Sequence, residues 1–131
     1  MKITCGTDII EIERIKKAIE TNENRFLNQI FTEQEVLYCE GRKNAKFQHY
    51  AARFAAKEAA FKALNEFIEN KYDISWKNIE ITNNKSGKPQ INLKECNFEM
   101  IKSMDISISH CKEYAVANVI ILYEEEANEI I

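Results

Sequence analysis

The sequence predicts an α+β fold in which an antiparallel sheet packs against a long central helix and several shorter helices. Two observations support this prediction. After an opening segment that alternates like a strand, helical spacing of apolar residues dominates the first half of the chain. Short alternating segments separated by turn residues occupy the second half. A length of 131 residues fits a single domain, 1–131, with one core.

The opening segments predict a strand followed by two helical segments. The first alternates loosely between polar and apolar residues. The second places Ile12, Ile15 and Ile19 on one face, with a basic flank elsewhere, which is typical of an amphipathic helix. The third resumes helical spacing after a polar break. In order, these segments span residues 2–10, 11–20 and 25–31.

A capping box predicts the next helix. Thr32 and Glu35 stand three residues apart, the spacing at which the two side chains satisfy each other's backbone N–H groups. We expect a helix to about Glu40, with Val36 and Leu37 turned inward and the glycine that follows marking its end.

The long central helix is the strongest prediction. Its large apolar residues recur at helical spacing and define a face bound for the core, at Phe47, Tyr50, Phe54, Phe61 and Leu64. Two positions for the end of this helix stay open. Asn65 tolerates the left-handed conformation found past helix ends, whereas Phe67 and Ile68 would continue the pattern by another turn.

The second half of the chain predicts strands at 76–82, 90–93, 104–109 and 114–123. The sequence NNKSGKP at 83–89 predicts a hairpin turn between the first two strands. A short helix is expected at 98–102, a turn at 110–113, and a fraying acidic tail at 124–131.

Composition excludes several classes of protein. A hydrophobic fraction of 45% and a charged fraction of 30% are those of a soluble globular protein. The net charge of −3 gives no reason to expect nucleic acid, and no apolar run reaches membrane length. The four cysteines lack metal-ligand spacing, and the N-terminus does not resemble an export signal. We therefore expect free thiols and a cytoplasmic protein with no nucleic-acid or membrane partner.

Two carboxylates stand in apolar surroundings. Glu58 falls in the middle of the apolar face of the central helix, and Asp8 is flanked by isoleucines in the first strand. Lys62 lies one turn beyond Glu58, and Arg53 and Lys57 form a second i, i+4 pair on a flank. A site for a metal and phosphates would use this arrangement. Two simpler interpretations stay open: Glu58 and Lys62 form an ordinary solvated pair, and Asp8 caps the following helix.

Several of these residues recur in a known family. Gly6-Thr7-Asp8, Arg14, the run from Arg53 to Lys62 (RFAAKEAAFK) and Ser107-Ile108-Ser109-His110 resemble the phosphopantetheinyl transferases, and within them the small holo-acyl-carrier-protein synthases. The resemblance covers nearly the whole chain. It implies the fold of that family and transfer of 4'-phosphopantetheine from coenzyme A to a serine of apo acyl carrier protein, with release of adenosine 3',5'-bisphosphate.

The resemblance also implies roles for the two carboxylates in apolar surroundings and for the lysine beside them. Asp8 and Glu58 would hold Mg²⁺, a hard cation that prefers oxygen ligands, although the resemblance leaves Mn²⁺ open. Lys62 would bind a phosphate oxygen and stabilise the departing bisphosphate. Either Glu58 or a metal-bound water would take the serine proton. Asp8, Glu58 and Lys62 are thus the expected catalytic residues.

The resemblance places the two substrates as well. Arg53, Lys57 and His110 would hold the nucleotide and its 3'-phosphate, although a lone histidine after a strand is commonly structural, and the turn at Gly87, Lys88 and Pro89 would line the coenzyme A channel. Basic and apolar residues of the first helices would receive the acidic carrier, at Arg14, Arg25 and Phe26. Small members of the family are trimers with sites between subunits, which implies a homotrimer here. Fatty acid biosynthesis is the expected process, with a secondary-metabolite carrier as the alternative.

Two features depart from the family. Asn65 stands where the family usually has glycine after its K-A-L or K-A-F, and acidic residues interrupt the first helix. The first departure means that the loop beside the site need not match that of the family. The second predicts a modest affinity for the carrier. A non-catalytic module that binds an acidic helical protein or coenzyme A is the rival hypothesis, with another phosphate-handling enzyme as a third.

Overall fold

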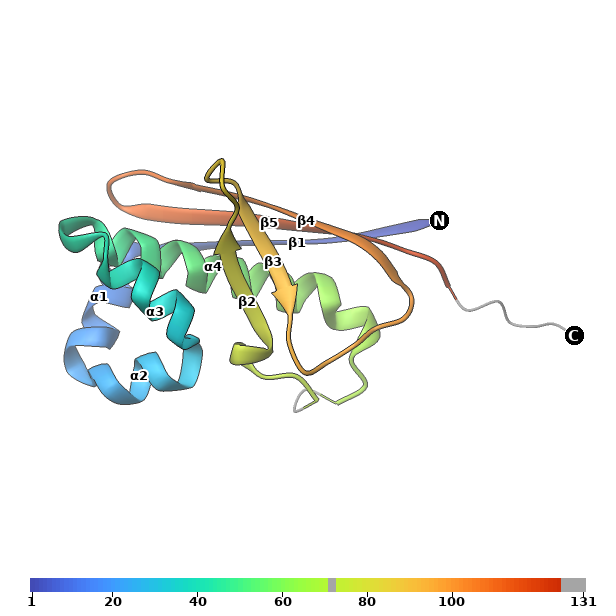
Figure 1. Cartoon of the computed structure of the whole chain (residues 1–131), viewed down its shortest axis with the longest axis horizontal. Coiled ribbons are helices and arrows are strands. Elements are labelled where there is room, and N and C mark those ends of the chain that lie inside the picture. The colour runs from blue at the N-terminus through green and yellow to red at the C-terminus, as the bar shows by residue number, and fades with distance from the viewer. Residues whose placement is uncertain (71–72, 126–131) are drawn as a thin grey trace, which may run out of the picture.

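The computed structural model describes residues 1–70 and 73–125, and the expected fraying at 126–131 lies outside them (Figure 1). Its helices are α1 (Ile12–Thr21), α2 (Glu23–Ile30), α3 (Glu33–Glu40) and α4 (Lys46–Leu64). Its strands are β1 (Lys2–Glu11), β2 (Ile79–Asn83), β3 (Pro89–Leu93), β4 (Ile101–His110) and β5 (Tyr114–Tyr123).

The strands form two separate antiparallel sheets. The larger has the order β1-β5-β4, so the first strand of the chain pairs with the last, and Asp8 lies opposite Ala117. The smaller is the hairpin β2-β3, which crosses α4 beside the larger sheet (Figure 1). The hairpins predicted around 83–89 and 110–113 are confirmed.

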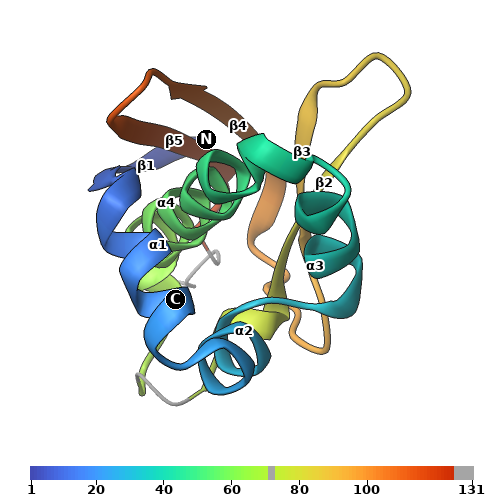
Figure 2. The ribbon, with the colours of Figure 1, turned by 90° about the vertical axis from the view of Figure 1, so that its left-hand side faces the viewer.

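Helix α4 occupies the centre of the molecule. Viewed almost along its axis, it has the larger sheet above it, α1 on one side and α3 with the β2-β3 hairpin on the other (Figure 2). Its buried surface consists largely of alanines, from Ala51 to Ala63, together with Tyr50 and Leu64. The expected stripe of large residues is therefore only partly core, because Phe47, Phe54 and Phe61 are half-buried at its edge.

The first helices follow their sequence patterns with one exception. Ile12, Ile15 and Ile19 are buried, as predicted. The capping box at the start of α3 forms with both of its hydrogen bonds. The prediction that Leu37 turns inward is wrong, because this side chain is 67% exposed. Glu35 and Cys39 face the core instead, since Glu35 finds buried hydrogen-bond partners there.

Two local predictions need correction, and one open alternative is decided. Residues 98–102 form a turn that leads into β4 rather than a helix, with the Ile101 N–H donating to Phe98 O. The expected strand at 76–82 begins with a 3-10 turn, η3 (Trp76–Asn78). Of the two endings that stay open for α4, continuation by another turn is confirmed, because Asn65 does not adopt the left-handed conformation. It opens a second 3-10 turn, η2 (Asn65–Phe67), which continues α4 and packs Phe67 against Tyr123.

Within residues 1–70 and 73–125, no helix is long and apolar enough to cross a membrane.

Candidate active site

The structure brings Asp8 and Lys62 together, although they are far apart in the sequence. The Lys62 ammonium donates to Asp8 Oδ1 at 3.3 Å and to the Thr7 carbonyl oxygen at 2.9 Å. Asp8 lies within β1, and α1 begins at Ile12 without a side-chain cap, so the interpretation of Asp8 as a helix cap is wrong. Lys62 forms its ion pair with Asp8, which also removes the simple i, i+4 interpretation of Lys62 with Glu58.

Glu58 interacts with both members of the Asp8–Lys62 pair. Its side chain is half-buried on α4, one turn before Lys62. Burial raises the pKa of the Glu58 carboxyl, and the nearby Asp8 carboxylate raises it further, while Lys62 acts in the opposite direction. A carboxylate of this kind is stabilised by additional positive charge. Glu58, Phe61, Lys62 and Asn65 line an open cavity of about 340 Å³.

The donor set fits a hard divalent cation. Asp8 and Glu58 interact electrostatically and both supply oxygen ligands, the type that Mg²⁺ uses together with phosphate oxygens and water. Among the residues that the structure describes, no three His, Cys, Asp or Glu side chains form a metal-binding cluster. An ion held here would therefore take part of its coordination from a substrate.

Arg53 lines a second cavity on the side of α4 that faces α3 and β2. Its guanidinium donates to Asn83 Oδ1 at 2.7 Å and lies 4.0 Å from the ring centroid of Tyr38. Arg42 approaches the same ring at 4.4 Å. Arg53 is only 3% exposed, and its Nε has no hydrogen-bond partner within the described residues. The cavity measures about 450 Å³ and its cationic lining suits an anion.

Two histidines lie next to this cationic region. His110, at the end of β4, is exposed, and its ring centroid lies 5.8 Å from that of His49 on α4. Burial lowers the pKa of His49, and the positive charges of Arg53, His110 and Arg42 lower it further. His49 was not among the residues that the sequence singled out, and its position on the helix gave no signal.

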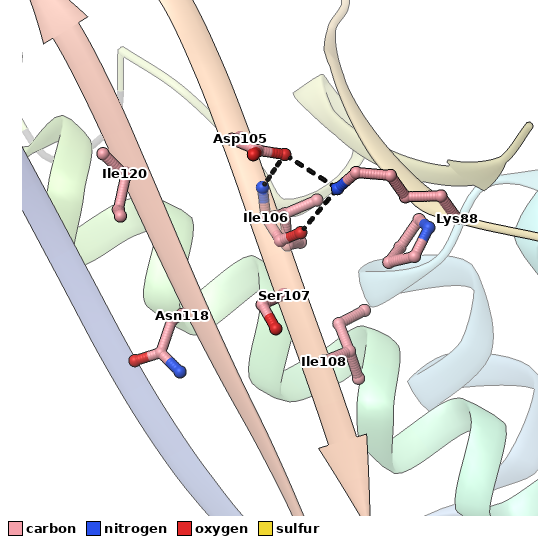
Figure 3. A pocket seen from close by; sticks show the side chains of 8 residues that line it. Lys88, Asp105, Ile106, Ser107, Ile108, Asn118 and Ile120 are labelled. Carbon is pink, nitrogen blue, oxygen red and sulfur yellow. Dashed lines mark hydrogen bonds and ion pairs between the residues drawn. The ribbon is translucent and has the colours of Figure 1, made fainter.

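The β2-β3 turn divides its residues between two cavities. Gly87, which has a φ of +88° that favours glycine, lines the Arg53 cavity. Lys88 and Pro89 line a different cavity of about 290 Å³ on the β4-β5 sheet. There the Lys88 ammonium donates to Asp105 Oδ1 at 3.0 Å, which ties the turn to β4 (Figure 3).

Lys57 lies somewhere other than the resemblance implies. Its side chain is fully buried, and its ammonium is 2.7 Å from Glu35 Oε1, inside the junction of α3, α4 and β2. Burial lowers the pKa of Lys57, while the Glu35 carboxylate opposes that shift. The structure therefore does not bring Lys57 together with Arg53 in the wall of the cavity.

The expected carrier-binding residues lie on α1 and α2. Arg14 and Arg25 are exposed. Phe26 is half-buried, and its ring stacks on Phe54 of α4 with a centroid distance of 6.3 Å. The two arginines are free to meet a partner, whereas Phe26 also contributes to packing.

Several residues of the Arg53 cavity were missed by sequence reasoning, namely Tyr38, Arg42, Asn83 and Asn84. The two asparagines fall in the NNKSGKP segment, for which the resemblance implies coenzyme A contacts only around Gly87, Lys88 and Pro89. Tyr38 and Arg42 come from the end of α3 and the loop after it, where no local pattern distinguishes them.

Sequence comparison and structure comparison agree. Residues 4–119 match the 4'-phosphopantetheinyl transferase superfamily. The chain is 44% identical over 126 residues to a holo-[acyl-carrier-protein] synthase of Ruminiclostridium cellulolyticum, covering 92% of each protein. It is 48% identical over 118 residues to that of Chloroherpeton thalassium, covering 88% of this chain and 94% of the relative.

Solved structures show the same likeness. A holo-(acyl-carrier-protein) synthase of Bacillus anthracis, in complex with CoA (3',5'-ADP), has a TM-score of 0.76 and 36% identity, with 90% of this chain and 94% of that chain covered. The Helicobacter pylori holo-[acyl-carrier-protein] synthase in complex with coenzyme A has a TM-score of 0.77 and 30% identity, with 90% and 99% covered.

Proposed function

Because this chain belongs to the 4'-phosphopantetheinyl transferase superfamily, among its holo-acyl-carrier-protein synthases, we propose that it transfers 4'-phosphopantetheine from coenzyme A to a serine of apo acyl carrier protein. The observation that carries the proposal is the grouping of Asp8, Glu58 and Lys62, of which Glu58 and Lys62 line one cavity and Asp8 pairs with Lys62. In the reaction, the serine oxygen bonds to the phosphorus on the pantetheine side. The bond from that phosphorus to the bridging oxygen breaks, and adenosine 3',5'-bisphosphate leaves.

Each polar residue of the group has a distinct task. Asp8 and Glu58 would hold Mg²⁺, which when bound neutralises charge on the diphosphate. The Lys62 side chain is 55% exposed, so its ammonium can pair with a phosphate oxygen as negative charge develops on the leaving group. Glu58, half-buried on α4 one turn before Lys62, is our candidate to accept the serine proton.

Coenzyme A would reach this group from the cationic cavity. Arg53, whose Nε has no hydrogen-bond partner among the residues that the structure describes, is our candidate for the 3'-phosphate, and His110 lies nearby at the end of β4. Gly87 would approach the nucleotide through its backbone, while Lys88 and Pro89 border the neighbouring cavity. The proposal thus keeps Arg53, His110 and the β2-β3 turn as coenzyme A contacts.

We propose a homotrimer with sites between subunits. The cavity at Glu58 and the cavity at Arg53 share no lining residue within one chain. On the outer face of the β1-β5-β4 sheet, Ile3, Ile9 and Ile120 are 67%, 62% and 50% exposed. Association through that face would cover these side chains and allow residues of two subunits to meet. Light scattering on the purified protein, at several concentrations, tests the expected mass of three chains.

The carrier would dock on the basic side of α1 and α2. Arg14 and Arg25 are exposed there and suit an acidic helical protein. We propose that the carrier belongs to fatty acid biosynthesis and that the enzyme works in the cytoplasm, which agrees with four free thiols.

The decisive experiment follows the mass of the carrier. The protein is incubated with coenzyme A, Mg²⁺ and either an apo fatty-acid carrier or an apo carrier of secondary metabolism. We expect the fatty-acid carrier to gain the mass of phosphopantetheine, and chelation to stop the gain. Adding Mn²⁺ to the chelated sample tests whether Mn²⁺ can replace Mg²⁺. Binding of coenzyme A without transfer to either carrier would contradict the proposal and identify a non-catalytic module.

A further inference from the structure

A buried ion pair connects α4 to the segments that surround the Arg53 cavity. Lys57 and Glu35 are 0% and 1% exposed. The Lys57 ammonium lies 2.7 Å from Glu35 Oε1 and also donates to the carbonyl oxygens of Ile30 and Trp76, at 2.9 and 3.0 Å. All three donor positions of the ammonium are therefore used inside the protein.

Glu35 is equally occupied. Its Oε1 accepts from the Thr32 N–H at 2.9 Å, as part of the capping box, and its Oε2 accepts from the Ile81 N–H at 2.7 Å. Ile81 is in the middle of β2, a strand that pairs with β3 alone and not with the larger sheet. This hydrogen bond is thus a direct polar link between the hairpin and α3.

The same hairpin carries the partner of Arg53. Asn83, two residues beyond Ile81, accepts from the Arg53 guanidinium at 2.7 Å and donates to the Gly87 carbonyl oxygen at 3.0 Å. Arg53 and Lys57 are one turn apart on α4. This turn of α4 is therefore linked to the hairpin in two ways. Lys57 reaches the hairpin through Glu35, and Arg53 bonds directly to Asn83.

We infer that Lys57 is a positioning residue and not a nucleotide ligand: its buried pair with Glu35 holds the β2-β3 hairpin and the start of α3 against α4, so that Asn83 and Gly87 meet Arg53. The inference rests on the proposed function only in taking the Arg53 cavity as the coenzyme site. A lysine that bound phosphate would need an ammonium accessible to solvent, whereas this one has its three hydrogen bonds within the protein.

Amine labelling of the unaltered protein tests this placement without any variant. The native protein is treated briefly with an acetylating reagent, with and without coenzyme A, and each lysine is quantified by mass spectrometry. Lys77, which is exposed, reports general reactivity, and Lys62 reports the proposed site. We expect Lys57 to react at least about ten times more slowly than Lys77, with or without coenzyme A. Rapid labelling of Lys57 that coenzyme A suppresses would overturn the inference.

The same experiment separates this inference from the proposed function. If coenzyme A fails to protect Lys62, the proposed site is in doubt, but slow labelling of Lys57 still supports its burial and rapid labelling still contradicts it.

A pair of variants tests the positioning role. Lys57→Met leaves the Glu35 carboxylate buried without its cation, and we expect the melting temperature to fall by about 10 °C or more. Adding Glu35→Gln removes that charge and should recover at least half of the loss. In Lys57→Met alone we expect KM for coenzyme A to rise by more than kcat falls. In the double variant, a glutamine oxygen at position 35 can still accept from the Ile81 N–H, so coenzyme A should bind within about three-fold of the wild type.

One control variant and two contrary results complete this test. Lys77→Met removes an exposed lysine beside Trp76 and should change neither the melting temperature nor coenzyme A binding. An unchanged melting temperature for Lys57→Met would overturn the inference. So would a stable double variant that binds coenzyme A about ten-fold or more weakly, because the lost affinity would then belong to the ammonium itself.

Discussion

Gly6 of β1 lies directly against the carbonyl oxygen of Ala59 in α4. A Cβ at position 6 would collide with that oxygen and would lie 2.8 Å from Ala63 N and 2.9 Å from Lys62 Cβ. The strand and the helix therefore approach so closely that only a hydrogen atom fits between them. Asp8 follows two residues later on the same face of the strand, which brings its carboxylate to Lys62 and Glu58.

Gly6→Ala should disrupt both the fold and the site. The added methyl group must push β1 away from α4, and overpacking of this kind typically destabilises by about 1–3 kcal/mol. We expect a lower melting temperature and a loss of transfer at temperatures where the variant is still folded. Gly41→Ala is the matched control, because a Cβ there would meet its nearest neighbour at 3.4 Å and φ is −67°. Equal stability of the two variants would contradict the close approach.

Glu58→Gln should abolish transfer while making the metal-free protein more stable at high pH. Loss of a charged group from the site is expected to lower kcat by about 100-fold or more. The pKa of Glu58 is raised on folding, so ionising this carboxyl weakens the folded state as pH rises through that pKa. Glu58→Gln removes this effect. The resulting gain in the free energy of unfolding should vanish at pH values below the ordinary pKa of glutamate. Thermal unfolding in chelator across pH measures it, with exposed Glu99→Gln as the control.

Arg53→Met should weaken the binding of coenzyme A more than that of dephospho-coenzyme A. The guanidinium is our candidate contact for the 3'-phosphate, and a charge-assisted contact of this kind contributes about 1.5–3 kcal/mol, or about ten-fold or more in Kd. Calorimetry with the two ligands gives the ratio, and Arg25→Met on α2 serves as the control. Equal weakening for both ligands would show that Arg53 acts on the pocket as a whole and not on the phosphate.

Arg14→Glu should weaken the binding of the carrier more than that of coenzyme A. Arg14 is exposed on α1 and lines neither the Glu58 cavity nor the Arg53 cavity, so the reversed charge should mainly slow association with an acidic partner. Surface plasmon resonance at two salt concentrations tests this, since the effect should shrink at high salt. Lys17→Glu makes the same change of charge on the same helix, and we expect a smaller effect there. If affinity for the carrier and for coenzyme A declines equally, α1 is structural and does not dock the carrier.

The short-range patterns were the most predictive features of the sequence. Helical spacing located α1 and α4, the capping box located α3, and turn residues located both hairpins. The same patterns exposed Asp8 and Glu58 as carboxylates in apolar surroundings, which is why the sequence alone predicts a site at these two residues. These signals succeed because each depends on neighbours within a few residues along the chain.

The errors arose where a side chain's environment comes from distant segments. Leu37 was expected inside, but Glu35 takes the inward position because the Ile81 N–H and the Lys57 ammonium lie there, 46 and 22 residues away in sequence. Tyr50 and Leu64 of α4 are in the core as expected, but Phe47, Phe54 and Phe61 are only half-buried. The sheet packs on the alanines of the helix instead, because small side chains let β1 approach. No periodicity within one helix records which face its neighbours will cover.

Local spacing and recognisable motifs are therefore enough to predict the class of fold, the order of its elements and the two carboxylates of the proposed site. No local pattern predicts that Lys62 pairs with Asp8, that Arg53 meets Asn83 and Tyr38 around a cavity, or that Lys57 is buried against Glu35; these contacts arise from the folding of distant segments. The physical reason is that the environment of a charged side chain is set by groups brought to it from remote parts of the chain, and those groups determine whether the charge faces solvent or the core.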